Sequence, residues 1–405
     1  MPTTFNNSVP QLPIGTIIQD LEIVKVLSIG PYGQVYMARH IQTFKRYAIK
    51  SLPHIGLDSR QLAFQRNEIT LHSHLSDHPH IIRLEKVVQT TEWTHAILEY
   101  GSEGDLFSAI TDKGIYHGNH ALIKDVFLQL IDAVRYSHDN HIFHRDLKPE
   151  NILTFNGGRT VKLADFGLAT TDAISTDYGC GSTFYFSPEC QGGLDRQKRV
   201  GYATAPNDVW ALGIILINLS AGRNPWRLAS LDDETFCGFL HDPNLLLKIL
   251  PISAELNKIL KRIFCLDPHR RITLDELYIR IQRCTYFTRT PEVTQYESMM
   301  TSAVISSSNK RTKKAKIRPT KLDLFNHPIV VDLPSPPQTP NQDTMTSSSS
   351  SSSSGSSSNS SISSLTDNVG TVLVNSNVTT DTFFFPKKGA ADTTNLDPHY
   401  IQVVV

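Results

Sequence analysis

The string HRDLKPEN at residues 144 to 151, followed by DFG at 165 to 167, constrains this chain more than any other feature. It places an acid (Asp146), a cation (Lys148) and an amide (Asn151) in one short loop, and Asp165 adds a second acid further along. An isolated HRD triplet would mean little, but the whole string with DFG behind it is highly specific. We therefore expect an active-site loop here rather than a solvated surface turn.

Composition narrows the class of protein. A chain of 405 residues with a formal net charge of zero gives no electrostatic case for direct binding of nucleic acid or a membrane. The five cysteines follow neither a disulfide framework nor a zinc-ligand spacing. The N-terminus shows no secretory signal, and the longest apolar run, at 211 to 222, is too short to span a bilayer. We expect reduced thiols and a location in the cytoplasm, the nucleus or both.

The chain divides by composition into an ordered part and a polar tail. Apolar residues recur at strand or helix spacing up to about residue 290, and serine-rich, basic and proline-rich stretches follow. Such a tail buries too little apolar surface to offset its ordering entropy. We predict a flexible arm at 1 to 14, a sheet lobe at 15 to 100, a helical lobe at 101 to 288 and a disordered tail at 289 to 405. Strands followed by helices predict an α+β fold.

Hydrophobic periodicity predicts the elements of both lobes. Alternating residues rich in Val, Ile and Tyr predict antiparallel strands, and apolar residues at helical spacing predict helices. The predicted strands lie at 17–27, 34–39, 45–51, 81–89 and 94–100. The predicted helices lie at 59–75, where a serine could form the cap, and at 105–111, 120–139, 206–221, 244–249, 253–264 and 273–282.

Lys50 lies in the sequence YAIK, at a strand position otherwise suited to burial. A buried ammonium group is costly unless it is paired, and Glu68 on the predicted helix is its natural partner. A lone lysine in such a place would more often extend its charge to the surface. The loop string downstream favours the paired interpretation.

A glycine-containing turn, SIGPYGQV at 28 to 35, precedes Lys50. Gly30 and Gly33 would let the backbone approach a ligand closely because they carry no side chain. By itself the turn is indistinguishable from that of an ordinary hairpin. Its position upstream of Lys50 favours a ligand-binding loop.

Taken together, these residues resemble a eukaryotic protein kinase over about two-thirds of the chain. Further matches fit the pattern. GSTFYFSPE at 181 to 189 resembles the family's segment ending in APE, with Ser187 in place of alanine. Asp208 resembles the helix acid that braces the catalytic loop, and Arg271 resembles the buried partner of Glu189.

The resemblance implies a bilobal protein-kinase fold and an ATP-dependent phosphotransferase that acts on protein substrates. Asp146 would orient the attacking hydroxyl and accept its proton, and Lys148 would neutralise charge on the transferring phosphoryl group. Lys50, fixed by Glu68, would contact the α- and β-phosphates of the nucleotide.

The resemblance also implies the ligand-binding positions. Asp165 and Asn151 would hold Mg²⁺ together with phosphate oxygens. The nucleotide would lie between the lobes, with Asp105 near its ribose. The other matching nucleotide-site positions are Ser28, Gly30, Gly33, Val35, Ala48, Lys50, Leu98, Glu99, Gly101 and Leu153.

Two details of the resemblance narrow the family branch. The residues LKPEN after Asp146, and Ser182 three residues before Tyr185, are similar to the serine/threonine branch, which implies serine or threonine acceptors. The stretch from 207 to 253 is similar to a fungal group of meiosis-restraining and nutrient-response kinases.

Two rival functions remain open on the sequence. Ser28 stands where the glycine-rich pattern has its first glycine, which would suit a pseudokinase that binds without turnover. The acids, the lysine and the amide described above are all present, which favours an active enzyme. A small-molecule kinase on the same fold is disfavoured by the SPE and DPHRRIT elements. In the tail, basic residues at 310 to 318 are either a signal for a nuclear-import receptor or a solvated charge run.

Overall fold

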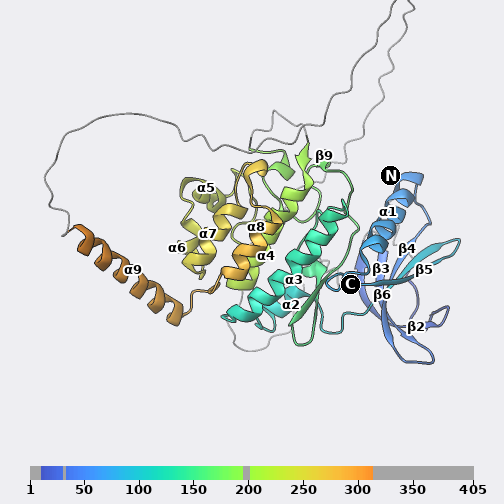
Figure 1. Cartoon of the computed structure of the whole chain (residues 1–405). Helices are drawn as coiled ribbons and strands as arrows, with labels where there is room; N and C mark the ends of the chain where they lie inside the picture. The colour runs from blue at the N-terminus through green and yellow to red at the C-terminus, as the bar shows by residue number, and fades with distance from the viewer. Residues whose placement is uncertain (1–10, 31–32, 195–200, 313–405) are drawn as a thin grey trace, which may run out of the picture. The chain divides into compact units, whose positions relative to one another are not determined.

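The computed structural model describes residues 11–30, 33–194 and 201–312, with side chains described as far as residue 302. Within these ranges a sheet with one helix comes first and a larger set of helices follows (Figure 1). The predicted α+β fold with a sheet lobe before a helical lobe is confirmed. We call these parts the N-lobe and the C-lobe. Most of the predicted arm and tail, at 1–10 and 313–405, lies outside the described residues.

The N-lobe sheet consists of six antiparallel strands in the order β1-β2-β3-β4-β6-β5. β4 and β6 lie inside the sheet, and most of their side chains are buried, which suits their apolar and β-branched sequences. Register pairs Lys50 of β4 with Val35 of β3 and with Ala96 of β6. The strands are β1 (Ile17–Ile18), β2 (Leu21–Gly30), β3 (Gly33–His40), β4 (Arg46–Pro53), β5 (Leu84–Gln89) and β6 (Trp93–Glu99).

Helix α1 (Ser59–Leu75) runs alongside this sheet (Figure 1). The predicted cap is wrong by one residue, because Asp58 and not the serine forms it. The Asp58 carboxylate accepts from the Gln61 amide at 2.8 Å, and the Gln61 side chain accepts from the Asp58 amide at 3.0 Å. This reciprocal capping box satisfies backbone donors at the start of the helix.

The C-lobe is built around helix α4 (Thr204–Ala221), most of whose residues are buried. A helix that is apolar on every side belongs in a core, as its composition predicts. The other elements are α2 (Leu106–Thr111), α3 (His120–Asp139), α5 (Glu234–His241), α6 (Leu245–Ile249), α7 (Ala254–Ile263), α8 (Leu274–Arg283), α9 (Pro291–Thr312), and the short strands β7 (Ile152–Phe155), β8 (Thr160–Leu163), β9 (Ile174–Ser175) and β10 (Tyr202–Ala203).

The buried apolar side chains of the described residues form three clusters. One fills the C-lobe and one fills the N-lobe sheet. The third combines Val35, Ala48 and Leu98 of the N-lobe sheet with Leu153 and Ala164 of the C-lobe. Because this cluster takes side chains from both lobes, it lies at their junction.

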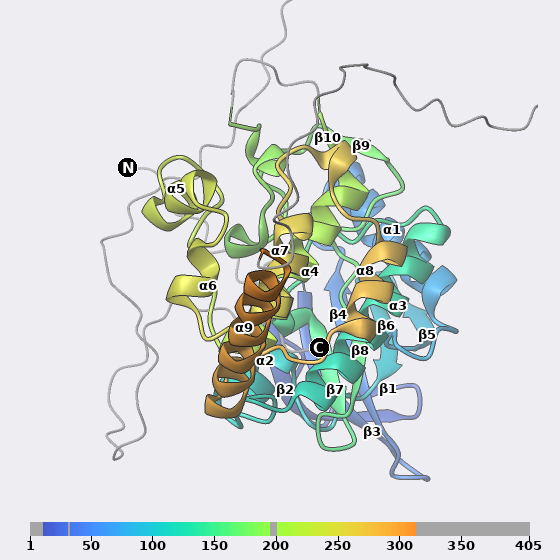
Figure 2. The same ribbon diagram turned by 60° about the vertical axis from the view of Figure 1, so that its left-hand side comes forward.

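Several stretches differ from the sequence predictions. Helix α5 and most of the short C-lobe strands were not predicted. Residues 291 to 312, which the sequence analysis assigns to the disordered tail, form helix α9 (Figure 2). Near the N-terminus, the Leu12 amide donates to the Tyr36 hydroxyl at 2.9 Å, so this end of the predicted arm is attached to the sheet.

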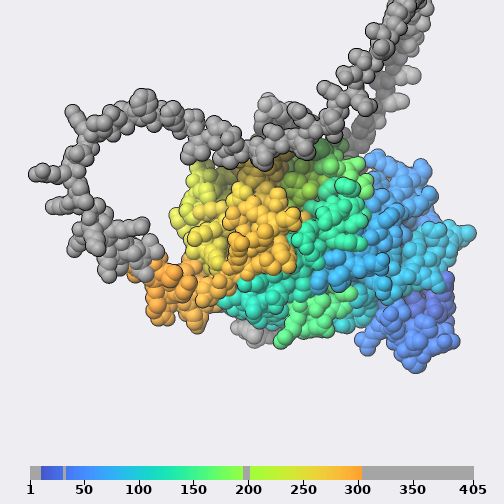
Figure 3. All heavy atoms as spheres, viewed as in Figure 1, coloured from blue at the N-terminus to red at the C-terminus, as the bar shows by residue number. Residues whose placement is uncertain are grey.

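Helix α9 is attached to the C-lobe through its first turns. Val293 is buried, and the Glu297 carboxylate accepts from the Ala254 amide at 2.7 Å and pairs with Arg289 at 3.3 Å. The described residues of α9 further along stand out from the lobe surface (Figure 3). None of the helices in the described ranges is long and apolar enough to cross a membrane. All five cysteines are free thiols.

Candidate active site

The loop at 144 to 151 is held by Asp208 from the buried helix α4. The Asp208 carboxylate accepts from the backbone amides of His144 and Arg145, each at 2.9 Å, and from Nε2 of His138 at 2.8 Å. Arg145 has a φ of +62°, a left-handed conformation that is unfavourable for a residue with a side chain. Two hydrogen bonds from backbone amides to the buried Asp208 carboxylate stabilise that conformation. Asp208 therefore braces the loop, as the sequence resemblance implies.

Asp146 lies within this loop, where neighbouring donors fix its carboxylate. Nζ of Lys148 donates to Oδ2 of Asp146 at 2.9 Å, and the Asn151 amide donates to Oδ2 at 3.2 Å and to the Asp146 carbonyl at 2.9 Å. Oδ1 of Asp146 and Oδ1 of Asn151 are buried, and neither accepts a hydrogen bond from the described residues. Buried oxygens are normally paired, so both are positioned to accept from a ligand or a cation.

Lys50 lies between two carboxylates that come from different elements. Its Nζ is 2.5 Å from Oε1 of Glu68 on α1 and 2.9 Å from Oδ1 of Asp165, just after β8. All three side chains are largely buried, with 14, 13 and 17% of their surfaces exposed. The pairing of Lys50 with Glu68 that the sequence predicts is therefore present. The additional bond to Asp165 ties the sheet to the C-lobe.

Charge is unevenly balanced among these three groups. Burial by itself would lower the pKa of Lys50, but the charges of Asp165 and Glu68 raise it above its ordinary value. Burial opposes ionisation of Asp165, yet Lys50 brings the pKa of Asp165 down to about 2. Burial raises the pKa of Glu68, although Lys50 offsets part of this effect. One buried ammonium cannot fully compensate two buried carboxylates, so the site favours a further cation.

The side chain after Asp165 is packed between two histidines. The ring of Phe166 lies 5.0 Å from that of His72 on α1 and 5.1 Å from that of His144. Nε2 of His72 donates to the carbonyl of Ile82 at 2.7 Å, and burial lowers the pKa of His72 to about 4. A neutral, hydrogen-bonded imidazole therefore fixes Phe166 and, with it, the direction of Asp165. No sequence motif indicated this histidine pair.

Most of the predicted nucleotide-site side chains gather at the lobe junction. Val35, Ala48, Leu98 and Leu153 all belong to the apolar cluster shared by the two lobes, and each is at most 4% exposed. At Gly101 an added Cβ would lie 2.7 Å from a methyl group of Leu153, so glycine allows this close packing. The arrangement provides an apolar wall of the kind that suits a flat aromatic base.

The glycine turn behaves differently at its two glycines. An added Cβ at Gly33 would lie 2.8 Å from the Leu52 side chain and 2.9 Å from the Ser51 carbonyl, so Gly33 is required for β3 to pack beside β4. At Gly30 the nearest atom would be at 3.6 Å, an ordinary contact. Ser28 is buried within β2 opposite Val35. Gly30 is therefore the glycine of this turn with room for a ligand.

Two predicted nucleotide-site side chains are engaged elsewhere. Both carboxylate oxygens of Glu99 lie 2.8 Å from Nζ of Lys162, so this side chain is paired with a lysine of the C-lobe. The Asp105 carboxylate accepts from the Ser108 amide at 2.7 Å and caps helix α2. Asp105 lies beside Leu153, as an isolated backbone bridge shows, so it borders the site while also serving as a cap.

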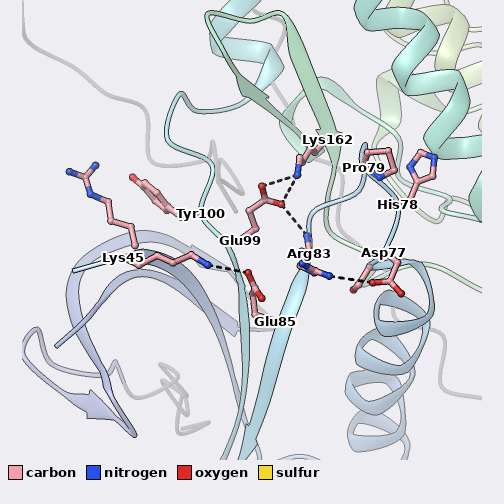
Figure 4. Close-up of a pocket in the computed structure, with 11 residues that line it drawn as sticks. Lys45, Asp77, His78, Pro79, Arg83, Glu85, Glu99, Tyr100 and Lys162 are labelled. Atoms are coloured by element: carbon pink, nitrogen blue, oxygen red, sulfur yellow. Dashed lines mark hydrogen bonds and ion pairs between the residues drawn. The ribbon is translucent and has the colours of Figure 1, made fainter. Parts of the chain in front are cut away.

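Glu99 faces a separate pocket of about 390 Å³ (Figure 4). Its wall carries cations and acids that pair with each other, including Arg83 with Asp77 at 3.5 Å and Lys45 with Glu85 at 3.5 Å. None of the catalytic-loop residues lines it. The lining residues are Lys45, Arg46, Ser76, Asp77, His78, Pro79, Arg83, Glu85, Glu99, Tyr100 and Lys162.

The segment at 181 to 189 packs closely against the catalytic loop. Nζ of Lys148 donates to Oγ of Ser182 at 2.9 Å. A Cβ on Gly181 would lie 2.4 Å from the Arg145 carbonyl, and φ there is +110°, so only glycine fits. Nearby, Oε2 of Glu150 is buried without a hydrogen-bond partner in the described parts of the chain, and burial raises the pKa of Glu150.

The end of that segment is anchored by an ion pair. The Arg271 guanidinium contacts both carboxylate oxygens of Glu189, and it also donates to the Pro206 carbonyl at 2.9 Å. It lies 4.9 Å from the ring of Trp210, which favours a cation. The partnership of Arg271 and Glu189 that the resemblance implies is present.

Comparison with known proteins fits this geometry. The family described as "Protein kinase domain" matches residues 21–280, more than half of the chain. The chain belongs to the protein kinase family. The match covers both lobes of the kinase and every residue of the site described above.

The kinase is also similar to individual fungal proteins. It is 48% identical over 298 residues to the "Negative regulator of sexual conjugation and meiosis" of Schizosaccharomyces pombe, covering 69% of this chain and 63% of that protein. It is 31% identical over 331 residues to "Serine/threonine-protein kinase VHS1" of Saccharomyces cerevisiae, covering 67% and 71%. It is 36% identical over 258 residues to "Serine/threonine-protein kinase SKS1" of the same yeast, covering 61% and 49%. The chain therefore covers less than two-thirds of the length of two of these relatives. The predicted similarity to the fungal group is confirmed.

Proposed function

We propose that this protein is an active serine/threonine protein kinase, which transfers the γ-phosphoryl group of ATP to hydroxyl groups of protein substrates. The observation that carries the proposal is the position of Lys50, bonded to Glu68 at 2.5 Å and to Asp165 at 2.9 Å. These two ion pairs connect strand β4 with helix α1 and with the C-lobe, which is the arrangement that phosphoryl transfer requires. The braced loop carrying Asp146 supplies the second half of the site.

In this proposal Asp146 acts on the acceptor hydroxyl. Its carboxylate orients the hydroxyl and takes the proton as the oxygen forms its bond to the γ-phosphorus, while the bond from that phosphorus to the bridging oxygen of ADP breaks. Lys148, which donates hydrogen bonds to both Asp146 and Ser182, would neutralise charge on the transferring phosphoryl group. Lys50 would hold the phosphates that leave with ADP.

The residues present fit a magnesium ion. Oδ1 of Asn151 is a buried amide oxygen without a hydrogen-bond partner in the described chain, and the trio around Lys50 carries more negative than positive charge. Hard oxygen donors of this kind, few in number and completed by phosphates, are those that Mg²⁺ prefers. Asp165 and Asn151 would hold the ion, which neutralises charge on the phosphates when bound.

The nucleotide itself would be bound between the lobes. The base would lie against the apolar side chains of Val35, Ala48, Leu98 and Leu153, with hydrogen bonds to the backbone between Glu99 and Gly101. Gly30 and the backbone of the turn that includes Ser28 and Gly33 would approach the phosphates. Asp105 would adjoin the ribose while retaining its cap on α2.

Two observations favour an active enzyme over a pseudokinase. The Lys50–Glu68–Asp165 trio is assembled, and Oδ1 of Asp146 and Oδ1 of Asn151 are buried without a hydrogen-bond partner in the described residues. Ser28, the feature that suits a pseudokinase, is buried within β2 opposite Val35. The bond from Lys148 to Ser182 supports serine or threonine as the acceptor.

A phosphate-transfer assay on the purified full-length chain tests the proposal. The protein is incubated with γ-labelled ATP, magnesium and degenerate peptides that carry serine, threonine or tyrosine as the acceptor. We expect label on serine and threonine peptides. Nucleotide binding without any transfer would support the pseudokinase, and transfer to tyrosine alone would overturn the assignment of acceptor.

The basic cluster at 310 to 318 falls beyond the side chains that the structure describes. Recognition by a nuclear-import receptor, and a location in the cytoplasm or nucleus, therefore stay predictions from the sequence. Cell fractionation with and without the cluster would test them.

A further inference from the structure

Arg145, the residue before Asp146, connects the catalytic loop with the activation segment, which we define as residues 168 to 189. Its Nε donates to the Leu168 carbonyl at 2.7 Å. One terminal nitrogen donates to Oγ of Ser175 at 3.0 Å and to the Asp177 carboxylate at 3.2 Å. The Arg145 side chain is only 8% exposed, so its partners determine how the segment lies on the loop.

A nearly buried guanidinium requires an anion close by, because an uncompensated buried charge is strongly unfavourable. Asp208 contacts Arg145 through the backbone amide, and the carboxylate that meets the guanidinium is that of Asp177. Asp177 is a residue of the activation segment itself, and 66% of its side chain is exposed. The chain thus supplies its own negative charge where Arg145 faces the segment.

Local structure holds Asp177 in this place. Strand β9 pairs with β10, with Ser175 opposite Tyr202. Oγ of Ser175 accepts from the Asp177 amide at 3.1 Å, which turns the backbone toward Arg145. Further along, the Tyr178 hydroxyl accepts from the Gly201 amide at 2.6 Å, and its ring lies 6.0 Å from that of Tyr202.

We propose that Asp177 is a positioning residue: its fixed carboxylate, through Arg145, holds the activation segment against the catalytic loop without any phosphate on the segment. The proposal rests on the proposed kinase activity. Charge-assisted hydrogen bonds between guanidinium and carboxylate are strong and directional, which suits this role. Ser175 is 5% exposed and already accepts two hydrogen bonds, so it acts as part of the same contact rather than as an acceptor of phosphate.

The segment ordered in this way reaches the reacting groups. Gly181 packs against the Arg145 carbonyl, and Ser182 accepts from Lys148, which in turn contacts Asp146. Loss of the Asp177 charge should therefore disturb the acceptor side of the site. The contacts of Lys50, which serve the nucleotide side, lie outside this connection.

The test compares Asp177→Asn with Asp177→Glu in the full-length chain, after phosphatase treatment and confirmation by mass spectrometry that no phosphate remains. Asp172→Asn is the matched control, because Asp172 is an exposed acid of the same segment that makes no ion pair in the described structure. We expect Asp177→Asn to lower kcat by about tenfold, the scale of one charge-assisted hydrogen bond, with the KM for ATP changed less than about twofold. Asp177→Glu should retain most of kcat, and the control should match the parent.

Hydrogen exchange supplies a readout that does not depend on catalysis. Backbone amides at 172 to 180 should exchange faster in Asp177→Asn than in the parent or the control. The proposal is overturned if Asp177→Asn keeps both its kcat and its exchange rates. It is also overturned if the phosphate-free parent is inactive and phosphate on Thr176 or Tyr178 restores activity. If the parent transfers no phosphate in any state, the proposed function fails, and the exchange rates still decide whether Asp177 orders the segment.

Discussion

Two buried histidines predict a loss of stability in mild acid. His72 packs against Phe166 and donates to the Ile82 carbonyl, and His95 lies within β6 with its Nδ1 2.9 Å from Oγ of Ser51. Burial lowers the pKa of each to about 4, from an ordinary value of 6.5. A histidine with a lowered pKa in the folded chain stabilises the protein above pH 6.5 and loses that contribution as the pH falls toward 4.

The magnitude follows from the two pKa values. Between about pH 7.5 and about pH 5 the unfolded chain takes up a proton at such a histidine while the folded chain does not, which lowers the free energy of unfolding by about 2 kcal/mol per residue. His72 and His95 together predict a loss of about 4 kcal/mol over this range. The loss from either residue corresponds to a shift of roughly 0.7 M or more in a urea midpoint.

Urea unfolding of the full-length chain, followed by tryptophan fluorescence at several pH values, measures this effect. His72→Gln removes the titrating group, while the glutamine amide can still donate to the Ile82 carbonyl. We expect this variant to lose about 2 kcal/mol less stability on acidification than the parent. His117→Gln, at an exposed position, is the control and should follow the parent. Equal pH dependence of His72→Gln and the parent would refute the reasoning.

Three further predictions concern the charged pairs. Lys50→Met and Glu68→Gln should each reduce kcat/KM strongly. The double variant should be little worse than Lys50→Met because the two residues act as a unit. Additive losses in the double-mutant cycle would show that Glu68 is not the functional partner of Lys50. Arg271→Met should lower the free energy of unfolding by about 3–5 kcal/mol because it leaves Glu189 without its cation, and a loss below about 1 kcal/mol in urea titrations would contradict this. Peptides with arginine two or three residues before the acceptor should be preferred, because Glu150 presents a buried carboxylate oxygen without a partner in the described residues. Glu150→Gln should weaken that preference. Selection of peptides with acidic residues or proline at these positions would contradict this prediction.

The sequence predicted the elements with clear periodicity and missed those without it. Helix α5 is short and contains Gly238, so Asp233 as its cap and the buried pair Phe236 and Phe239 were its available signals. Helix α9 has no apolar stripe, and the hydrogen bond from the Ala254 amide to Glu297 joins residues 43 positions apart, which no local pattern encodes. At α1 the two neighbours Asp58 and Ser59 are both favourable caps, and only the backbone geometry selects between them.

The site shows the same division between local and long-range information. Asp146, Lys148 and Asn151 lie in one loop, so their spacing alone predicts that they come together. The direction of the Glu99 side chain depends on its pairing with the distant Lys162, and that of Asp105 depends on its capping of helix α2. The sequence alone does not reveal either direction.

The contact of Asp177 with Arg145 joins residues 32 positions apart. A search for acids after DFG would have identified Asp177 as a candidate, but only the fold shows which acid meets the arginine.

The Asp146→Asn variant gives the most direct test of the central claim that this site transfers phosphate. Label transfer to a serine peptide and binding of magnesium–ATP by titration calorimetry are measured on the same full-length preparation, with Asp139→Asn, an exposed acid on α3, as the control. Because Asp146 acts on the hydroxyl, we predict that transfer falls by about 10²–10⁴ while the affinity for nucleotide changes by no more than a few-fold. Transfer at the parental rate in Asp146→Asn would contradict the account.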